Sequence, residues 1–515
     1  MGRFACASEG LRRRVSAPFL DGYAIDECVN SHAKPRFGRS VSVCYNRVEE
    51  VHMQQDNDLT RRDLLKTASV AAIATGPLIQ TSKAASDQVR YGLIGSGSRG
   101  NYLLKHLKEI ETGRCMALCD IQPKQLENGV ATIGNNPTQY SDYRQMLDRK
   151  DLDAIFVITP LFTHFGITKD VLQSGRHVFC EKCLVFKPEE VHALRRLATE
   201  HPKQILQTGL QRRYSGFYQT VKQMVDKGIL GNVHHIHAQW HRNMINHPSS
   251  LWTMKPGGES NINNWRLYRS MSGGLTAELM SHQVDISDWM MGSSPEFVMG
   301  LGSLDVLKDG RNVFDNIQLI FKYPGGQKLT YSAISTSQFL PYFNASRPEM
   351  GEIIMGTEGT IEITVGDDKN SAIAWWYREP PKTATVGAPK KEDHFVAGAT
   401  MVAAGAGSVG PIPLMTSDMN ISADDGFFSR EAKFARRWLY QKGIWMQEEP
   451  VNPVDTELRS FFQNCRDGQK PHADLEVGMG DAIAVILANQ AMDEGRKVYF
   501  NEIDKPNLVA SRKTL

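Results

Sequence analysis

The sequence has few cysteines, no long apolar run and almost no net charge, and each shortage excludes a class of protein. Eight cysteines among 515 residues, three of them before residue 53, are too sparse for a disulfide framework. No apolar run reaches the roughly 18 residues that a membrane-spanning helix needs. The 59 Lys and Arg residues are balanced by 57 Asp and Glu residues, unlike the basic surface of a nucleic-acid-binding protein. We therefore expect neither a membrane span nor a nucleic-acid partner.

The N-terminal region carries a pattern typical of export. Arg61 and Arg62 stand in the run LTRRDLLK, an apolar stretch follows over residues 68–79, and small residues surround Ala84. This order predicts a twin-arginine signal over residues 53–85 and a periplasmic mature protein, or a cytoplasmic one if the signal is not used. Because such signals stand at the N-terminus, we expect translation to start at Met53. Residues 1–52 are then a mis-annotated or disordered extension.

The first half of the mature chain alternates short apolar strands with helical patterns. Strand-like runs occupy residues 89–94, 115–119, 154–158, 177–180 and 205–207. This alternation predicts an α/β domain over residues 86–210, with a parallel sheet covered on both faces.

After about residue 210 the pattern changes to longer strands in succession. Residues 211–500 are predicted to form a C-terminal α+β domain with a large, mostly antiparallel open sheet. The Gly-, Ala- and Pro-rich residues 380–425 are predicted to be an irregular insertion, and residues 501–515 a tail.

A glycine-rich turn follows the first predicted strand. Gly95 allows the tight turn, Gly97 lets the backbone approach a pyrophosphate, and Gly100 lets the next helix pack against the strand. Ser98 and Arg99 open that helix, whose N-terminus favours an anion. The pattern in this context predicts a dinucleotide site.

The residue at the end of the second strand indicates which dinucleotide is bound. Asp120 lies 20 residues after Gly100, where a carboxylate accepts hydrogen bonds from ribose hydroxyls and repels a 2′-phosphate. Ile121 follows, with no adjacent Arg or Lys to pair such a phosphate. NAD is therefore favoured over NADP.

Further motifs occur in a fixed order along the chain. They are Thr159-Pro160 with His164, Glu181-Lys182-Cys183, the segment 273–285 containing Glu278 and His282, and the Gly-containing segments 356–360, 468–471 and 495–498. Together they resemble the glucose–fructose oxidoreductase / inositol dehydrogenase / MocA (Gfo/Idh/MocA) family over about residues 88–500. The resemblance implies a Rossmann domain, a second domain whose open sheet often serves in oligomers, and reversible oxidation of a sugar or cyclitol hydroxyl by NAD(P).

The resemblance also assigns roles to individual residues. The family's Glu-Lys-Pro motif maps to Glu181, Lys182 and Cys183, and its lysine lies near the nicotinamide. Its Asp-x-x-x-His motif maps to Glu278 and His282. Cys183 replaces a proline that rigidifies the turn, and Glu278 replaces a shorter aspartate. Thr159, Pro160 and His164 are expected to belong to the cofactor pocket.

Oxidation of an alcohol needs a base for the hydroxyl proton and a hydride acceptor. His282 suits the first role because an imidazole titrates near working pH. Lys182 can stabilise developing alkoxide charge. Glu278 lies one helical turn before His282 and is expected to orient the imidazole or bind a neighbouring hydroxyl. Asp285 lies near the same face and is included among the candidate substrate contacts.

Other candidates have competing structural explanations. Arg212, Trp265 and Arg266 are candidate sugar contacts, although Trp265 fits a core equally well. In strand 233–241, alternation places His235, His237 and His241 on one face with Gln239, as a polar stripe; we expect no metal there. Cys180 and Cys183 could form a redox pair, but small buried side chains are the favoured interpretation.

The leading hypothesis is an exported, NAD-binding sugar oxidoreductase. Free NAD is scarce outside the cytoplasm, so the cofactor is expected to stay tightly bound and to be recycled by a second substrate. One rival is a glycoside hydrolase that uses bound NAD transiently. A second rival is a sugar-binding protein with a vestigial nucleotide site.

Overall fold

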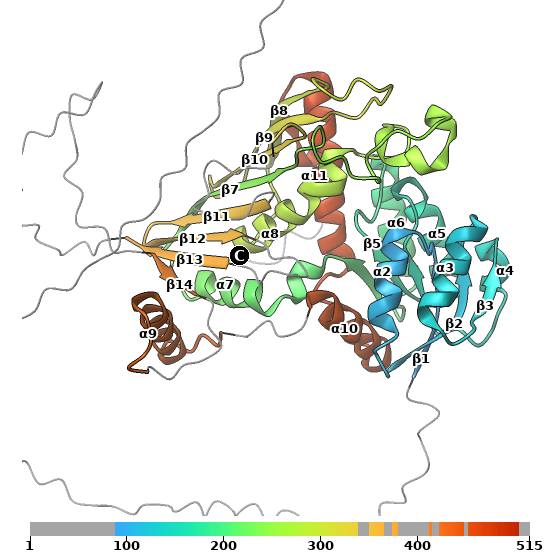
Figure 1. Cartoon of the computed structure of the whole chain (residues 1–515), viewed down its shortest axis with the longest axis horizontal. Coiled ribbons are helices and arrows are strands. Elements are labelled where there is room, and N and C mark those ends of the chain that lie inside the picture. The colour runs from blue at the N-terminus through green and yellow to red at the C-terminus, as the bar shows by residue number, and fades with distance from the viewer. Residues whose placement is uncertain are drawn as a thin grey trace, which may run out of the picture. The chain divides into compact units, whose positions relative to one another are not determined.

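The computed structural model describes residues 88–337, 350–364, 373–379, 411–414, 422–446 and 452–503 (Figure 1). All of them belong to one compact unit that spans Thr81–Leu515. The predicted export signal, most of the predicted insertion at 380–425 and residues 504–515 lie outside the described residues.

The first sheet has six parallel strands in the order β3-β2-β1-β4-β5-β6. The strands are β1 Val89–Ile94, β2 Gly113–Cys119, β3 Thr138–Tyr140, β4 Ala154–Val157, β5 His177–Glu181 and β6 Leu206–Gly209. The connecting helices are α2 Ser98–Leu107, α3 Pro123–Ile133, α4 Tyr143–Leu147, α5 His164–Gln173 and α6 Pro188–Glu200. Every residue of β4 is buried, as expected of a parallel strand covered on both faces. The predicted Rossmann fold is confirmed.

The strand order reverses between β1 and β4. In open α/β sheets a ligand binds beyond the carboxyl ends of the strands at such a reversal. The segments that follow β1, β2, β4 and β5 contain Gly95, Asp120, Thr159 and Lys182. The fold thus brings four separate motifs to one edge.

The second sheet has nine strands in the order β14-β13-β12-β11-β7-β10-β9-β8-β15. The strands are β7 Val233–His241, β8 Phe297–Ser303, β9 Asn316–Lys322, β10 Lys328–Ile334, β11 Met350–Gly356, β12 Gly359–Thr364, β13 Ile373–Arg378, β14 Ile412–Pro413 and β15 Val498–Tyr499. Its strand pairs are antiparallel except β7 with β10. The predicted large, mostly antiparallel sheet is confirmed.

Helices connect this sheet to the site and to the first domain. They are α7 Gly216–Asp226, α8 Ser281–Met291, α9 Phe427–Gln441, α10 Pro453–Asp467 and α11 Leu475–Glu494. Short 3₁₀ helices are η1 Leu161–Thr163, η2 Gln211–Tyr214, η3 Gly258–Ser260, η4 Ile262–Leu267 and η6 Phe500–Glu502, and η5 Thr276–Met280 is a π-helix. Helix α11 contacts both β8 and β6, so it is packed between the two sheets (Figure 1). No helix in the described part of the chain has the length and apolarity required to cross a membrane.

Helix α10 packs into the first domain although it comes after most of the second. Phe461 and Phe462 join a buried cluster with Tyr91, Phe156 and Phe179, and the rings of Phe156 and Phe461 meet edge to face with centroids 5.1 Å apart. Such aromatic pairs stabilise a core by about 1 kcal/mol beyond their buried area. The strand–helix pattern of the sequence did not predict that α10 packs against the first domain.

Candidate active site

A cavity of about 1430 Å³ opens at the carboxyl edge of the first sheet and is lined by both domains. Residues predicted from the sequence make up much of its wall: Gly95, Gly97, Ser98, Arg99, Asp120, Ile121, Thr159, Pro160, His164, Glu181, Lys182, Trp265, Arg266, Glu278 and His282. The structure therefore brings the dinucleotide turn and the candidate catalytic groups into one space.

The glycine turn has the shape that a dinucleotide requires. A Cβ on Gly95 would lie 2.4 Å from the carbonyl oxygen of Ile158, and one on Gly100 would lie 1.9 Å from the carbonyl oxygen of Gly95. A Cβ on Gly97 would meet no protein atom within 4 Å, because this position faces the open cavity. Gly97 is the N-cap of α2 and no side chain caps the helix, so the first-turn amides are available to an anion. These residues fit a pyrophosphate.

Asp120 organises the outer end of the cavity. One carboxylate oxygen accepts the Ser96 amide at 2.8 Å, and the other accepts the Gln122 amide at 2.8 Å. Burial raises the pKa of Asp120, and these amides oppose the shift. The Ile121 side chain beside it is 70% exposed. A carboxylate next to an apolar contact fits a ribose with free hydroxyls.

Lys182 is held by the backbone of a π-helix. Its Nζ donates to the carbonyl oxygens of Ala277 at 2.7 Å and Glu278 at 3.0 Å, both within η5. A π-helical turn shifts the hydrogen-bond register, and such turns are frequent at functional sites. An ammonium has three donors, so the arrangement leaves one for a ligand in the cavity. The Lys182–Cys183 peptide bond is cis.

His282 is the second residue of α8, directly after that π-helix, and is buried, with its ring centroid 5.9 Å from that of Trp240. Burial lowers the pKa of His282 well below its usual 6.5, and the charges of Lys182 and Arg212 add to the shift. The imidazole is therefore neutral at ordinary pH and able to accept a proton. Its Nδ1 atom has no hydrogen-bond partner among the described residues.

Glu278 is paired with Arg266 rather than with the imidazole. The Arg266 Nε atom donates to a Glu278 oxygen at 2.9 Å, and the guanidinium lies 4.2 Å from the Trp265 ring centre. Burial would raise the pKa of Glu278, but the charges of Arg266 and Lys182 outweigh it and lower the pKa. Within the described residues no hydrogen bond joins the Glu278 carboxylate to His282, and Glu278 lines the cavity.

His164 lies beneath the cavity with both ring nitrogens next to carbonyl oxygens. Nδ1 lies 2.7 Å from the oxygen of Cys183, and Nε2 lies 2.8 Å from that of Thr159. Only a doubly protonated ring donates to both. Burial lowers the pKa of His164, but the neighbouring Cys180 and the two carbonyls outweigh it and raise the pKa to about 9. His164 thus adds a fixed positive charge and ties two motif loops together.

Arg99 and Glu181 form an ion pair at 2.6 Å in the cavity wall. Glu457, on α10, lies behind them with both carboxyl oxygens buried and without a hydrogen-bond partner in the described structure. Burial, reinforced by Glu181, raises the pKa of Glu457 well above its usual range. The sequence did not indicate this buried carboxyl group, because α10 was not expected beside the first domain.

Two predicted substrate contacts need correction. Arg212 is buried in an ion pair with Glu352, and Asp285 is buried in an ion pair with Arg213 at 2.7 Å. Neither Arg212 nor Asp285 lines the cavity. Their charges are instead neutralised inside the second domain, because an unpaired buried charge is costly. Gly100 also does not line the cavity; it supports the turn through close packing.

Two segments that line the cavity carry no motif in the sequence. Lys255, Asn261, Ile262 and Asn263 line it from the segment before Trp265, and Ser141–Arg144 line it from the end of β3. None of these residues belongs to a recognisable motif, so only tertiary structure places them. The described residues contain no group of three potential metal ligands, and Cys180 and Cys183 are buried and free.

Comparisons with known proteins agree with this geometry. The family model "Oxidoreductase family, NAD-binding Rossmann fold" matches residues 89–209, and the "GFO/IDH/MocA C-terminal domain" model matches residues 218–362. The chain is 27% identical over 218 residues to the uncharacterized oxidoreductase YrbE of Bacillus subtilis, covering 42% of this chain and 58% of that protein. It is 30% identical over 156 residues to inositol 2-dehydrogenase of Burkholderia cenocepacia, covering 30% and 46%.

The chain spans about half the length of these curated relatives. Among solved structures, scyllo-inositol dehydrogenase from Lactobacillus casei, with bound NAD(H) and scyllo-inositol, has a TM-score of 0.54 at 16% identity, covering 80% of this chain and 99% of that one. At that identity the likeness shows the fold alone. With consecutive models of one family matching both domains in order, the chain belongs to the Gfo/Idh/MocA oxidoreductase family.

Proposed function

We propose that this protein is an NAD-dependent oxidoreductase that transfers a hydride between a bound nicotinamide and a hydroxyl-bearing carbon of a sugar, a cyclitol or a derivative. One observation carries the proposal: the glycine turn, the Lys182 ammonium and the His282 imidazole line the same cavity. The similarity to an inositol dehydrogenase supports the substrate class.

The chain's own groups suit such a reaction. The nicotinamide of a dinucleotide bound at the glycine turn would supply the hydride acceptor. His282, kept neutral by burial and neighbouring cations, takes the hydroxyl proton. Lys182, fixed by two carbonyl oxygens, directs its remaining donor at the alkoxide that develops. The Arg266–Glu278 pair offers both a donor and an acceptor to neighbouring hydroxyls.

The choice of NAD rests on Asp120. Its two bonds to backbone amides fix a carboxylate in the cavity wall, and a 2′-phosphate would be repelled there. We expect the dissociation constant for NADP to exceed that for NAD, measured by nucleotide fluorescence titration, and Asp120→Asn to narrow the difference. Equal affinities in the wild type would contradict this assignment.

A sugar-panel assay tests the reaction. We expect the absorbance of the enzyme-bound cofactor in the reduced-nicotinamide band to rise with one group of sugars or cyclitols, and no rise in Lys182→Met. Release of an aryl aglycone without net reduction would instead identify a redox-assisted glycoside hydrolase. Sugar binding without any turnover would identify a binding protein with a vestigial site.

We further propose that the protein is exported through its twin arginines and keeps its cofactor bound. The supporting pattern is Arg61-Arg62 before an apolar run and a small-residue cleavage site. We expect Arg61→Lys/Arg62→Lys to move the protein from the periplasmic to the cytoplasmic fraction. We also expect acid treatment of the purified mature protein to release NAD(H); an empty site would contradict a resident cofactor.

We also propose a homo-oligomer through the open face of the nine-stranded sheet. Met299 and Ile320 are cross-strand partners on that face, 43% and 44% exposed, and nearby Leu301 is 73% exposed. Exposed apolar side chains grouped on a sheet face favour association. We expect sedimentation to report an oligomer in the wild type and a smaller species for Leu301→Asp. A monomeric wild type would contradict the proposal.

A further inference from the structure

The segment 249–267 of the second domain reaches across the cavity to the residues that follow Asp120. The amide oxygen of Asn263 accepts a hydrogen bond from Nε2 of Gln122 at 3.3 Å. The backbone amide of Gln122 in turn donates to the Asp120 carboxylate. Gln122 and Asn263 both line the cavity, so this bond joins the two domains across the end of the cavity that Asp120 marks.

The Asn263 amide is held in the required orientation by its own helix. Its nitrogen donates to Oδ1 of Asn261 at 3.1 Å, and the same oxygen accepts the Asn263 backbone amide at 3.0 Å. Asn261 is therefore both the N-cap of η4 and the group that directs the Asn263 oxygen toward Gln122. An amide oriented before contact loses less conformational entropy when the contact forms.

One short helix reaches both ends of the cavity. Residues three apart lie one above the other in a 3₁₀ helix, so Asn263 and Arg266 of η4 share a face. Asn263 contacts Gln122 beside Asp120, and Arg266 pairs with Glu278 next to Lys182 and His282. This face of η4 therefore runs along the cavity from the nucleotide end to the catalytic end.

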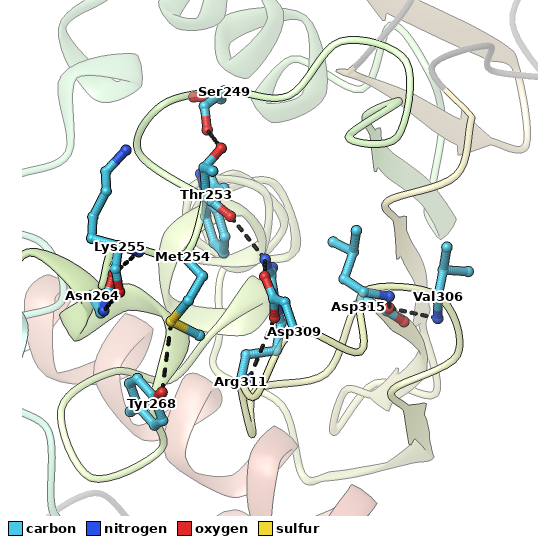
Figure 2. A network of polar contacts seen from close by, with 12 residues as sticks. Ser249, Thr253, Met254, Lys255, Asn264, Tyr268, Val306, Asp309, Arg311 and Asp315 are labelled. Atoms are coloured by element: carbon cyan, nitrogen blue, oxygen red, sulfur yellow. Dashed lines mark hydrogen bonds and ion pairs between the residues drawn. The ribbon is translucent and has the colours of Figure 1, made fainter. Parts of the chain in front are cut away.

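Figure 2 shows the polar contacts that anchor this segment to the rest of the second domain. The buried Asn264 side chain accepts the Lys255 amide at 2.7 Å and donates to the Lys255 carbonyl oxygen at 2.8 Å. The nearly buried Arg311 donates to the Trp252 carbonyl oxygen at 2.9 Å and pairs with Asp309. These contacts hold residues 252–264 from two sides.

We propose that the η4 face formed by Asn263 and Arg266 acts as a clasp that retains the dinucleotide, with Asn263 and Gln122 closing the cavity at the adenosine end. A dinucleotide that occupied this cavity would have the glycine turn on one side and η4 on the other. Its release would require the Asn263–Gln122 contact to open. The inference rests on the proposed function and deepens it, because it names the residues that make NAD a resident cofactor.

The test measures cofactor release from the purified, loaded full-length mature protein. NADH release after a chase with excess NAD is followed by fluorescence for the wild type, Asn263→Ala and Gln122→Ala. The loss of one hydrogen bond corresponds to a roughly three- to tenfold faster release. Because the two residues act through one contact, the double variant should release NADH about as fast as either single variant.

Asn246→Ala is the matched control, since Asn246 is exposed on the same part of the chain and does not line the cavity. Its release rate should equal that of the wild type, and unchanged melting temperatures should show that all variants fold. If Asn263→Ala and Gln122→Ala both release NADH at the wild-type rate, the proposed clasp is wrong but the proposed function stands. The same follows if the two effects on the release rate add in the double variant. A folded wild type that binds no NAD(H) contradicts the proposed function and the clasp together.

Discussion

The two walls of the cavity are built in different ways. The wall from the first domain includes bare backbone: a glycine turn without room for Cβ atoms at Gly95 and Gly100, and a helix N-terminus without a side-chain cap. The wall from the second domain presents side chains on irregular elements, with His282 after a π-helix and Arg266 on a 3₁₀ helix. Bare backbone at the glycine turn thus favours a dinucleotide, whereas the groups suited to the chemistry, Lys182 and His282, meet at irregular elements of the second domain.

The largest expected effect comes from removing Lys182, a motif residue of the first domain whose ammonium is held by carbonyl oxygens of the second. Lys182→Met should lower kcat/KM about 1,000-fold, because the alkoxide loses its positioned cation, while the affinity for NADH stays within about threefold because the glycine turn is untouched. Steady-state kinetics and fluorescence titration provide the two measurements. The exposed Lys203→Met is the control. Equal losses in binding and turnover would show that the two walls are not separable.

A side chain added at the glycine turn should weaken NADH binding, whereas Lys182→Met should weaken turnover. Gly97→Val places a side chain where no protein atom lies within 4 Å, so the fold should survive, while NADH affinity falls about 100-fold because the backbone no longer approaches the pyrophosphate. Gly426→Val is the matched control: Gly426 is also a helix N-cap with a similar φ and an open Cβ position. Titration and thermal melting check both variants, and unimpaired NADH binding by Gly97→Val would contradict the assigned site.

His164 should make stability depend on pH. The pKa of His164 is raised to about 9 in the folded protein, so its contribution is fully present below the unfolded value near 6.5 and is lost as pH rises through about 9. We expect His164→Gln to remove about 3 kcal/mol of that pH-dependent free energy of unfolding. Denaturant unfolding of both proteins at about pH 6 and pH 9.5 gives the difference. Parallel pH dependences would show that the ring is not charged.

The smallest expected effect is the change of kcat/KM with pH that His282, in the wall from the second domain, causes. The neutral fraction of an ordinary histidine, with a pKa of 6.5, would fall about fourfold from pH 8 to pH 6. The pKa of His282 lies well below that value because of burial and the neighbouring cations, so kcat/KM should change less than about twofold over this interval from this group. A pH profile of the wild type checks it. An acid limb near 6.5 that His282→Gln abolishes would refute the shift.

Local patterns in the sequence determined much of this protein: the parallel sheet, the turn at Gly95–Gly100 and the residues Asp120, Lys182 and His282 that share the cavity. The sheet, the glycine turn and Asp120 could be predicted because a glycine spacing or a strand–helix alternation is fixed by short-range sterics and periodicity. Lys182 and His282 were indicated by the resemblance of their motifs to those of the Gfo/Idh/MocA family. Only the tertiary structure showed that Arg212 and Asp285 are buried in ion pairs, that α10 packs into the first domain, and that Asn263 meets Gln122 from 141 residues away. Such contacts depend on which distant segments pack together, and no local pattern encodes that choice.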